Sequence, residues 1–253
     1  MPRGKVAIVT GGTSGIGYEI ARYFFEHDTD VVVASSRQEA VERTIKEIGC
    51  EGIAADLSKA ADCRKLVDHT IEKFGRVDIL INNAGIQHVC PIEEFPEEKW
   101  EFMMDLMLNA PFRLMKYCWP YMKKNHWGRI LNIGSIQGLV ASPYKSCYVS
   151  AKHGLNGLTM AAALEGGEYG ITVNSICPAY VDTPLVQKQI ASQAVVHNIS
   201  EDQVINDIML KNSAIKKLLD PIDIAKLARF LCSDGASMIT GACIPIDGGW
   251  TAS

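Results

Sequence analysis

The feature that most constrains this chain is a glycine-rich turn placed directly between a short apolar strand and an amphipathic helix. Residues 6–9 are the apolar run VAIV, and the sequence TGGTSGIG follows at residues 10–17. Residues 14–27 then place apolar side chains at helical spacing. Glycines in such a turn let backbone N–H groups approach a pyrophosphate at the helix N-terminus. The order of strand, glycine turn and helix therefore predicts a dinucleotide-binding α/β fold.

The rest of the chain repeats the alternation of strand and helix. Six more segments with strand character occur at residues 31–34, 52–55, 77–81, 128–133, 171–176 and 243–246, and the first of them is continuously apolar. Continuously apolar strands are typical of parallel sheets that are buried on both faces. We therefore predict one domain over residues 1–253, a Rossmann-type doubly wound parallel sheet of about seven strands with helices on both faces.

Two segments depart from this regular pattern. A helical pattern over residues 99–125 contains Pro111 and Pro120, which predict a kink or a break. Residues 184–220 are polar and partly helical, and they follow the carboxyl end of a strand. An insertion at that place is typical of a substrate lid.

Composition excludes several classes of protein. The net charge is −4, and the one short basic cluster, Lys123 with Lys124, does not predict a nucleic-acid surface. No apolar run reaches membrane-spanning length, and the N-terminal apolar run is too short for a signal peptide. The eight cysteines form no Cys-x-x-Cys pair, which predicts reduced thiols in a cytoplasmic protein and no metal site.

A candidate catalytic centre lies between residues 135 and 152. Tyr148 and Lys152 are four residues apart and would share one face of a helix. An ammonium beside a phenol favours the phenolate, which lowers the tyrosine pKa from about 10. Ser135 could hold the oxygen of a carbonyl or an alcohol while a proton moves.

The end of the second strand bears on the choice of cofactor. An acidic residue there usually grips a ribose 2′-hydroxyl, but this chain has Ser35-Ser36-Arg37. An arginine with two serines suits a 2′-phosphate, and it suits equally a solvated arginine that opens the next helix. NAD is the expected cofactor, and NADP is the alternative.

These motifs together resemble the short-chain dehydrogenase/reductase family over nearly the whole chain. The resemblance rests on TGGTSGIG, Asp56, the NNAG element at residues 82–85, Ser135, YVSAK at residues 148–152, the loop 178–183 and IDGGW near the C-terminus. It implies a nicotinamide cofactor, a homotetramer and a catalytic set of Ser135, Tyr148 and Lys152. The implied cofactor-binding residues are Gly11, Thr13, Ser14, Gly15, Ile16, Gly17, Arg37, Asp56, Leu57, Asn83, Tyr148, Lys152, Val181 and Thr183.

A closer resemblance is to bacterial D-3-hydroxybutyrate dehydrogenases. It rests on GIQHVCPIEEFP, KSCYVSAKHG, TPLVQKQI and IDGGW. In that subgroup, residues matching Gln87, Lys145 and Gln189 hold the substrate carboxylate. An ammonium and two amides can satisfy a carboxylate through charge-assisted hydrogen bonds. The expected substrate site consists of Gln87, Ser135, Gln137, Lys145, Tyr180 and Gln189.

The chain departs from the pattern of its relatives at two positions near this site. The subgroup's histidine two residues after the serine is Gln137, which carries no charge. The family's catalytic asparagine in the long helix is Met107. Asn109 lies about 200° further round a regular helix, so it cannot take over that role. A proton relay that uses the asparagine is therefore impaired or rebuilt in this chain.

We expect an oxidoreductase that transfers a hydride between a nicotinamide cofactor and a small 3-hydroxy acid, converting D-3-hydroxybutyrate to acetoacetate. The first alternative is an NADPH-dependent reductase of another ketone, such as a 3-oxoacyl derivative, which Arg37 favours. The second alternative is a cofactor-binding protein with impaired catalysis, which Met107 favours. We expect no nucleic-acid or membrane partner.

Overall fold

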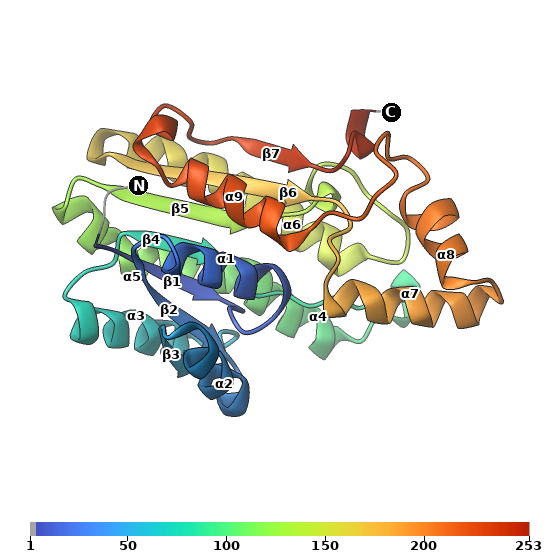
Figure 1. Ribbon diagram of the computed structural model, residues 1–253, viewed down its shortest axis with the longest axis horizontal. Helices are drawn as coiled ribbons and strands as arrows, with labels where there is room; N and C mark the ends of the chain where they lie inside the picture. The colour runs from blue at the N-terminus through green and yellow to red at the C-terminus, as the bar shows by residue number, and fades with distance from the viewer. Residues whose placement is uncertain (1–3, 253) are drawn as a thin grey trace.

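The computed structural model describes residues 4–252, except for the side chains at positions 192, 196 and 197, and a parallel sheet runs through its centre (Figure 1). The seven strands are paired in the order β3-β2-β1-β4-β5-β6-β7. They are β1 (Lys5–Thr10), β2 (Thr29–Ser35), β3 (Glu51–Ala54), β4 (Ile79–Asn82), β5 (Gly128–Ile133), β6 (Ile171–Pro178) and β7 (Cys243–Ile246). The doubly wound parallel sheet that the apolar runs predict is confirmed.

Helices cover both faces of the sheet because successive side chains of each strand point to opposite sides. On β1, Ala7 and Val9 face a core that α1 and α9 cover, whereas Ile8 faces a core that α3, α5 and α6 cover. The helices of these layers are α1 (Gly15–Phe25), α2 (Gln38–Ile48), α3 (Ala60–Phe74), α5 (Ala110–Lys124), α6 (Ser146–Gly166) and α9 (Pro221–Leu231). The central strands β1, β4, β5 and β6 and most of β2 are thus buried on both sides, whereas the edge strands β3 and β7 are half-buried.

The long helix predicted over residues 99–125 is interrupted by one π-helical turn. Helix α4 (Glu97–Met104) passes into the π-helical segment η2 (Asp105–Asn109), and α5 follows. Pro111 lies in the first turn of α5 and has no N–H to donate to the preceding turn, so the hydrogen-bond ladder changes register there. The break predicted from the prolines is therefore present before Pro111, whereas Pro120 lies inside α5.

Between β6 and β7 the chain leaves the sheet and forms a helical excursion beyond its carboxyl edge (Figure 1). Helices α7 (Pro184–His197) and α8 (Glu201–Gln203) and the π-helical segment η5 (Val204–Met209) form it. Ile190, Val204 and Met209 are its buried core. A parallel bridge between Val181 and Leu219 closes its base. We call residues 184–220 the lid segment, which agrees with the insertion predicted from sequence.

Two further observations concern the chain as a whole. All eight cysteines lie in the described part of the chain, and each is a free thiol. Among the described helices, none is both long enough and apolar enough to cross a lipid bilayer.

Candidate active site

The candidate site lies where the strand order reverses. Strands β1 and β4 are neighbours in the sheet although β2 and β3 separate them in sequence. Such a reversal opens a crevice at the carboxyl ends of the strands. A cleft of about 310 Å³, here the main cleft, lies there between the glycine turn, Asn83 and Lys152. A second cavity of about 120 Å³, here the side pocket, lies between Gln87, Lys145 and Gln189. Ser135 and Tyr148 line both cavities.

The glycine turn after β1 is built so that no side chain covers its backbone. Gly11 and Gly15 have φ angles of +62° and +54°, a region that glycine adopts without strain. A Cβ on Gly17 would collide with the Asn83 amide and the Gly11 carbonyl. The bare backbone at the start of α1 is the arrangement that a pyrophosphate requires, so these residues fit a dinucleotide.

The two asparagines after β4 connect the ends of neighbouring strands. Asn83 donates its backbone N–H to Thr10 Oγ1 and its amide to the Thr10 carbonyl, both at 2.8 Å. Asn82 donates to Asn132 Oδ1 at 2.9 Å, and Asn132 in turn donates to Thr159 at 2.8 Å. These asparagines therefore have a structural role, and Asn83 lines the main cleft as well.

Most of the residues expected at the cofactor come together in the main cleft. Those that line it are Gly11, Ser14, Gly15, Ile16, Asn83, Tyr148, Lys152 and Thr183. Val181 lines the side pocket instead, and Thr13, Gly17, Arg37, Asp56 and Leu57 line neither cavity. Thr13 and Leu57 are each 4% exposed, and Leu57 packs in the core.

Sequence reasoning missed part of the lining. The additional residues of the main cleft are Ala84, Gly85, Ile86, Ile133, Gly134, Pro178, Ala179, Pro184 and Leu185. Each lies within a few positions of a residue that was predicted. Proximity in sequence to the NNAG element and to the loop 178–183 was the signal that could have found them.

The two charged residues expected beside the adenosine, Arg37 and Asp56, differ in whether other side chains already bind them. Arg37 is exposed at the start of α2, and no ion pair joins it to another described residue. Asp56 already accepts hydrogen bonds from the Ser58 hydroxyl at 2.7 Å and pairs with Lys59 at 3.2 Å. The bond from Ser58 lowers the pKa of Asp56, and burial opposes it. Asp56 therefore stays ionised and shapes its own loop, whereas Arg37 can bind an anion.

Helix α6 and strand β5 bring the three candidate catalytic residues together. Tyr148 and Lys152 lie one turn apart on α6, with the lysine Nζ 5.6 Å from the centre of the tyrosine ring. Ser135 follows the end of β5, and its Oγ accepts a hydrogen bond from the Gln137 backbone N–H at 3.1 Å. The Lys152 ammonium donates to the Ile133 carbonyl at 2.7 Å. The predicted helix face and the position of the serine are therefore present.

The titration of this centre differs from the expectation. Burial raises the pKa of Tyr148, and the hydrogen bond with Ser135 opposes that rise. Burial also lowers the pKa of Lys152 to about 8. The expectation that the lysine lowers the pKa of the phenol is not met, because both groups are withdrawn from water and the ammonium donates to a backbone carbonyl instead.

The side pocket collects the expected substrate residues from distant parts of the chain. Gln189 of α7 donates its Nε2 to Oε1 of Gln87, in the loop after β4, at 2.6 Å. The Lys145 ammonium lies 5.9 Å from the centre of the Tyr180 ring. Burial lowers the pKa of Lys145, and no carboxylate of the described residues pairs with it. The pocket therefore offers an uncompensated positive charge beside two amides.

Gln137 completes this pocket. Its side chain is 4% exposed, and its Oε1 is buried without a hydrogen-bond partner among the described residues. Buried polar atoms are normally paired, and because Gln137 lines the side pocket, its Oε1 can accept a hydrogen bond from a ligand bound there. All six residues expected at the substrate, Gln87, Ser135, Gln137, Lys145, Tyr180 and Gln189, line the side pocket.

Met107 and Asn109 point in opposite directions from the π-helical turn. Met107 is 1% exposed and packs with Met103, Cys147 and Ala151, and Tyr148 lies against this cluster. Asn109 is exposed and donates to Asp105 Oδ1 at 2.9 Å. Asn109 therefore does not reach Lys152, in agreement with the sequence argument.

Comparisons with known proteins agree with this geometry. The model of the short chain dehydrogenase family matches residues 5–194. An uncharacterized oxidoreductase of Bacillus subtilis (strain 168) is 46% identical, with 99% of both chains covered. The D-beta-hydroxybutyrate dehydrogenase of Rhizobium meliloti (strain 1021) is 45% identical, over 98% of this chain and 99% of the relative. The crystal structure of a single-substitution variant of actinorhodin polyketide ketoreductase with NADPH superposes with a TM-score of 0.93 at 30% identity, covering 100% of both chains.

Proposed function

The chain belongs to the short chain dehydrogenase family, and from that premise we propose that this nicotinamide-dependent oxidoreductase converts D-3-hydroxybutyrate to acetoacetate. The observation that carries the proposal is the unpaired Lys145 ammonium in the side pocket, next to the Gln87 and Gln189 amides. The named function of the Rhizobium meliloti relative supports the same substrate.

The chemistry of the side pocket favours a small monocarboxylate. A buried cation without a partner costs free energy, and a substrate carboxylate would remove that cost. Gln87 keeps its Nε2 free because its Oε1 accepts from Gln189, so it can donate to the same carboxylate. The cavity of about 120 Å³ is large enough for an acid of about four carbons.

The catalytic step uses Ser135, Tyr148 and Lys152. In oxidation the substrate hydroxyl gives its proton to the phenolate oxygen of ionised Tyr148, its C–H bond releases a hydride, and a C=O bond forms. Ser135 donates a hydrogen bond to the reacting oxygen, and the nicotinamide ring, when bound, accepts the hydride. Because burial raises the pKa of Tyr148, the phenol is ready to donate a proton in reduction, and oxidation gains from alkaline pH.

The cofactor choice rests on the end of β2. NAD is the cofactor expected from the sequence resemblance, whereas the free Arg37 after two serines favours NADP. We propose that Arg37 decides between them, because the chain has no acidic residue at positions 35–37 to grip a ribose hydroxyl.

The test of the substrate is a comparison of steady-state rates for D-3-hydroxybutyrate and for its methyl ester, each with NAD and with NADP. We expect turnover of the acid and a loss of at least about 10-fold in kcat/KM for the ester, because the ester has no charge for Lys145. Equal rates for acid and ester would contradict the proposal.

A second candidate function has an observation of its own. Arg37 and the structural likeness to a ketoreductase that was solved with NADPH favour reduction of another ketone, such as a 3-oxoacyl derivative. NADPH-dependent reduction of such a ketone, with no activity on 3-hydroxybutyrate, would establish it. Cofactor binding without turnover of any alcohol in a broad panel would instead indicate a binding protein with impaired catalysis.

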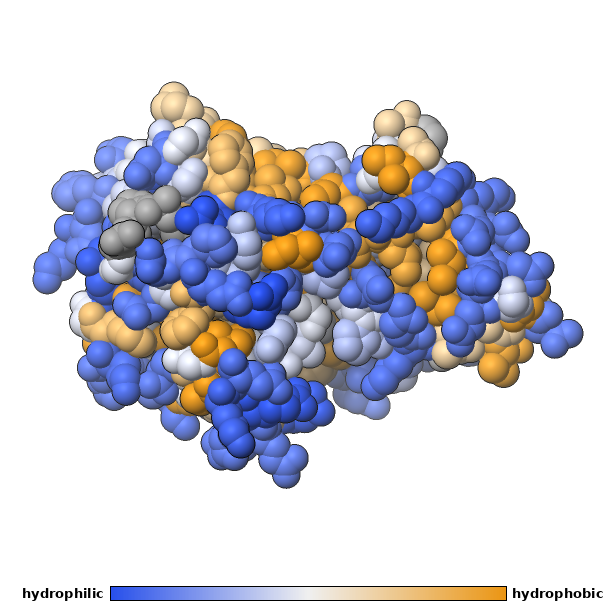
Figure 2. Space-filling model, in the orientation of Figure 1, coloured by the Kyte–Doolittle hydropathy of each residue, from blue (hydrophilic) through white to orange (hydrophobic). Residues whose placement is uncertain are grey.

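We also propose that the chain is a single domain that assembles as a cytoplasmic homotetramer. The free thiols suit a reducing compartment. Strand β7 is an edge of the sheet, and Figure 2 shows apolar side chains gathered along this edge and beside the lid segment. Phe230 is 49% exposed and Met238 is 93% exposed near the same edge. The mass measured by light scattering tests the assembly, and a monomer at micromolar concentration would contradict it.

A further inference from the structure

The back of the catalytic pair is closed by a side chain that cannot transfer a proton. The single π-helical turn η2 directs Met107 inward, while its neighbour Leu108 packs against Gly154 of α6. The Met107 sulfur lies 3.5 Å from the position that a Cβ on Gly85 would take. The thioether therefore fills the space between the loop after β4 and the helix that carries Tyr148 and Lys152.

Met107 belongs to a buried, largely apolar cluster against which Tyr148 packs. Met103, Cys147 and Ala151 complete the buried cluster, with Trp100 and Phe95 packed behind it. A thioether accepts hydrogen bonds weakly and donates none. An apolar cavity of this kind stays dry, because a water molecule needs two or more polar partners.

The polar partner of Lys152 is a backbone carbonyl of β5 and is not a member of the Met107 cluster. Its Nζ donates to the Ile133 carbonyl at 2.7 Å, and Ile133 lines the main cleft. The titratable groups near the ammonium are Tyr148 of its own helix and Cys177 of β6. Segment η2 contributes none on this side, because Asp105 pairs with Arg113 on its other face.

We infer that Met107 is a positioning residue that keeps the rear of Tyr148 and Lys152 dry, so that the pair exchanges its protons with solvent only through the main cleft. This inference rests on the proposed function insofar as Tyr148 transfers a proton. During oxidation Tyr148 receives the hydroxyl proton of the substrate, and the phenol later loses that proton to water at the mouth of the cleft. No proton passes between α5 and α6.

The test uses protein labelled with ¹⁵N-lysine, with the Lys152 ammonium signal assigned by its absence in Lys152→Met. Exchange of the ammonium protons with water is measured with and without saturating NADPH or NADH, whichever binds. In the wild type we expect the bound cofactor, which blocks the cleft, to slow exchange by at least about 10-fold. Met107→Leu, which has similar volume and remains apolar, should behave like the wild type.

Met107→Asn should open the rear to water, so exchange should stay fast when the cofactor is bound. The pH at which Lys152 titrates should also rise from about 8, because a hydrated ammonium is stabilised. Met107→Ser serves the same purpose if the asparagine variant does not fold. Fast exchange in cofactor-bound wild type, or equal behaviour of the Leu and Asn variants, would overturn the inference. These readouts need no substrate, so they stand apart from the test of 3-hydroxybutyrate.

Discussion

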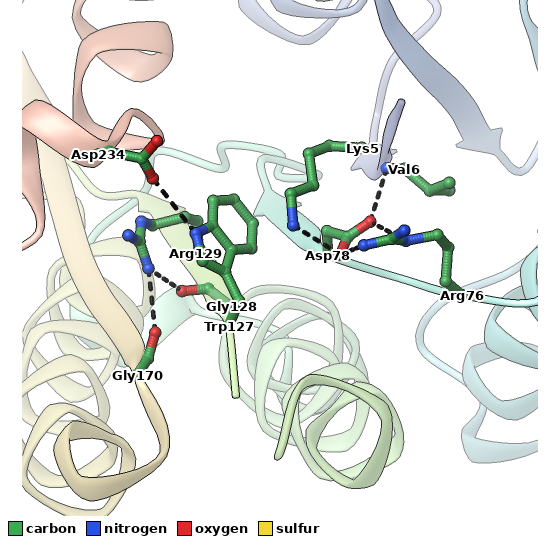
Figure 3. A network of polar contacts seen from close by, with 9 residues as sticks. All are labelled: Lys5, Val6, Arg76, Asp78, Trp127, Gly128, Arg129, Gly170 and Asp234. Carbon is green, nitrogen blue, oxygen red and sulfur yellow. Dashed lines mark hydrogen bonds and ion pairs between the residues drawn. The ribbon is translucent and has the colours of Figure 1, made fainter. Parts of the chain in front are cut away.

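Buried charged groups are paired differently at the two ends of the strands. We call the side where the strands begin the amino edge and the side where they end the carboxyl edge. At the amino edge Asp78 is completely buried, and both of its oxygens are paired (Figure 3). Arg76 donates to it through two nitrogens, at 2.6 and 2.7 Å. The Val6 backbone N–H donates at 2.9 Å, and Lys5 pairs at 3.4 Å. This carboxylate joins the start of β1 to the segment before β4.

A second group at the amino edge is held by stacking. The Trp127 ring lies between Lys5, at 3.9 Å from Nζ, and Arg129, at 4.4 Å from the guanidinium carbon. Arg129 is 3% exposed, and it donates to the carbonyls of Gly128 and Gly170 at 2.8 and 3.0 Å (Figure 3). The described residues thus compensate the Asp78 carboxylate, whereas Arg129 has carbonyl acceptors and a stacked ring but no ion pair, and its Nε has no hydrogen-bond partner among them.

At the carboxyl edge the polar groups are left incomplete. Lys145 has no acidic partner among the described residues, and Gln137 Oε1 has no donor. Lys152 donates to one backbone carbonyl. A buried charged or polar group that has its partners supports the fold. A buried group without a partner lowers the stability of the fold, and a ligand can supply the missing partner. The comparison therefore separates structural charge from functional charge, and it predicts which variants lose stability and which lose activity.

The largest effect is expected at Tyr148. Tyr148→Phe removes the hydroxyl that transfers the proton, so kcat should fall by at least about 10³-fold. The melting temperature should change little, and the cofactor should still bind, as measured by fluorescence of the bound dinucleotide. Near-normal turnover in this variant would remove Tyr148 from the mechanism.

Asp78→Asn should produce the reverse pattern. It leaves Arg76 and Lys5 without their shared counter-charge, and we expect the free energy of unfolding to fall by about 3 kcal/mol. Denaturation in urea measures this loss, while kcat per folded molecule should remain that of the wild type. A loss of kcat without a loss of stability would show that the amino edge is not purely structural.

Lys145→Met should raise KM for an acidic substrate by about 30-fold, because a charge-assisted bond is lost. The pKa shift of Lys145 also determines the direction in which KM changes with pH. Burial lowers the pKa of Lys145, so the ammonium loses its charge earlier as pH rises, and KM of the wild type should increase on the alkaline side. In Lys145→Met, which has no ammonium at this position to lose its charge, this alkaline increase in KM should be absent. A neutral ester, whose binding should not change, is the matched control substrate.

Arg37→Ala tests the cofactor end of the same edge. We expect the Kd for NADPH to rise by about 10-fold and the Kd for NADH to stay within about 2-fold, because one charge-assisted contact to a phosphate is lost. Fluorescence titration of the apoprotein with each dinucleotide measures both constants. Equal changes for the two cofactors would mean that Arg37 does not read the 2′ position.

The smallest effect concerns backbone strain beside Lys145. Tyr144 has a φ of +64° although it carries a side chain, and its carbonyl accepts from the Cys90 N–H at 3.1 Å. Tyr144→Asn should stabilise the protein by about 0.5–1 kcal/mol, since asparagine tolerates this conformation better. Denaturation in urea, with KM as the second readout, would show whether the strain also positions Lys145. A loss of stability would contradict the strain argument.

The sequence by itself determined the parts of this protein that depend on neighbouring residues. The apolar residues of these segments determined the strands, because a strand buried on both faces is largely apolar, although β5 and β6 also bury Arg129, Asn132 and Asn174. The glycine turn and the spacing of Tyr148 and Lys152 are equally local, since they follow from the geometry of a turn and of one helical turn. For the same reason the inward position of Met107 and the outward position of Asn109 could be predicted before the structure was seen.

Only the tertiary structure decided which distant groups meet and how deeply each is buried. The Gln87 to Gln189 hydrogen bond joins residues 102 positions apart, and Asp78 pairs with Lys5 across 73 positions. The pKa of Tyr148 went against the expectation, because it depends on removal from water and not on spacing in a helix. The periodicity of neighbouring side chains can be read from the sequence. The burial of side chains and the contacts between distant residues are decided only when the whole chain packs.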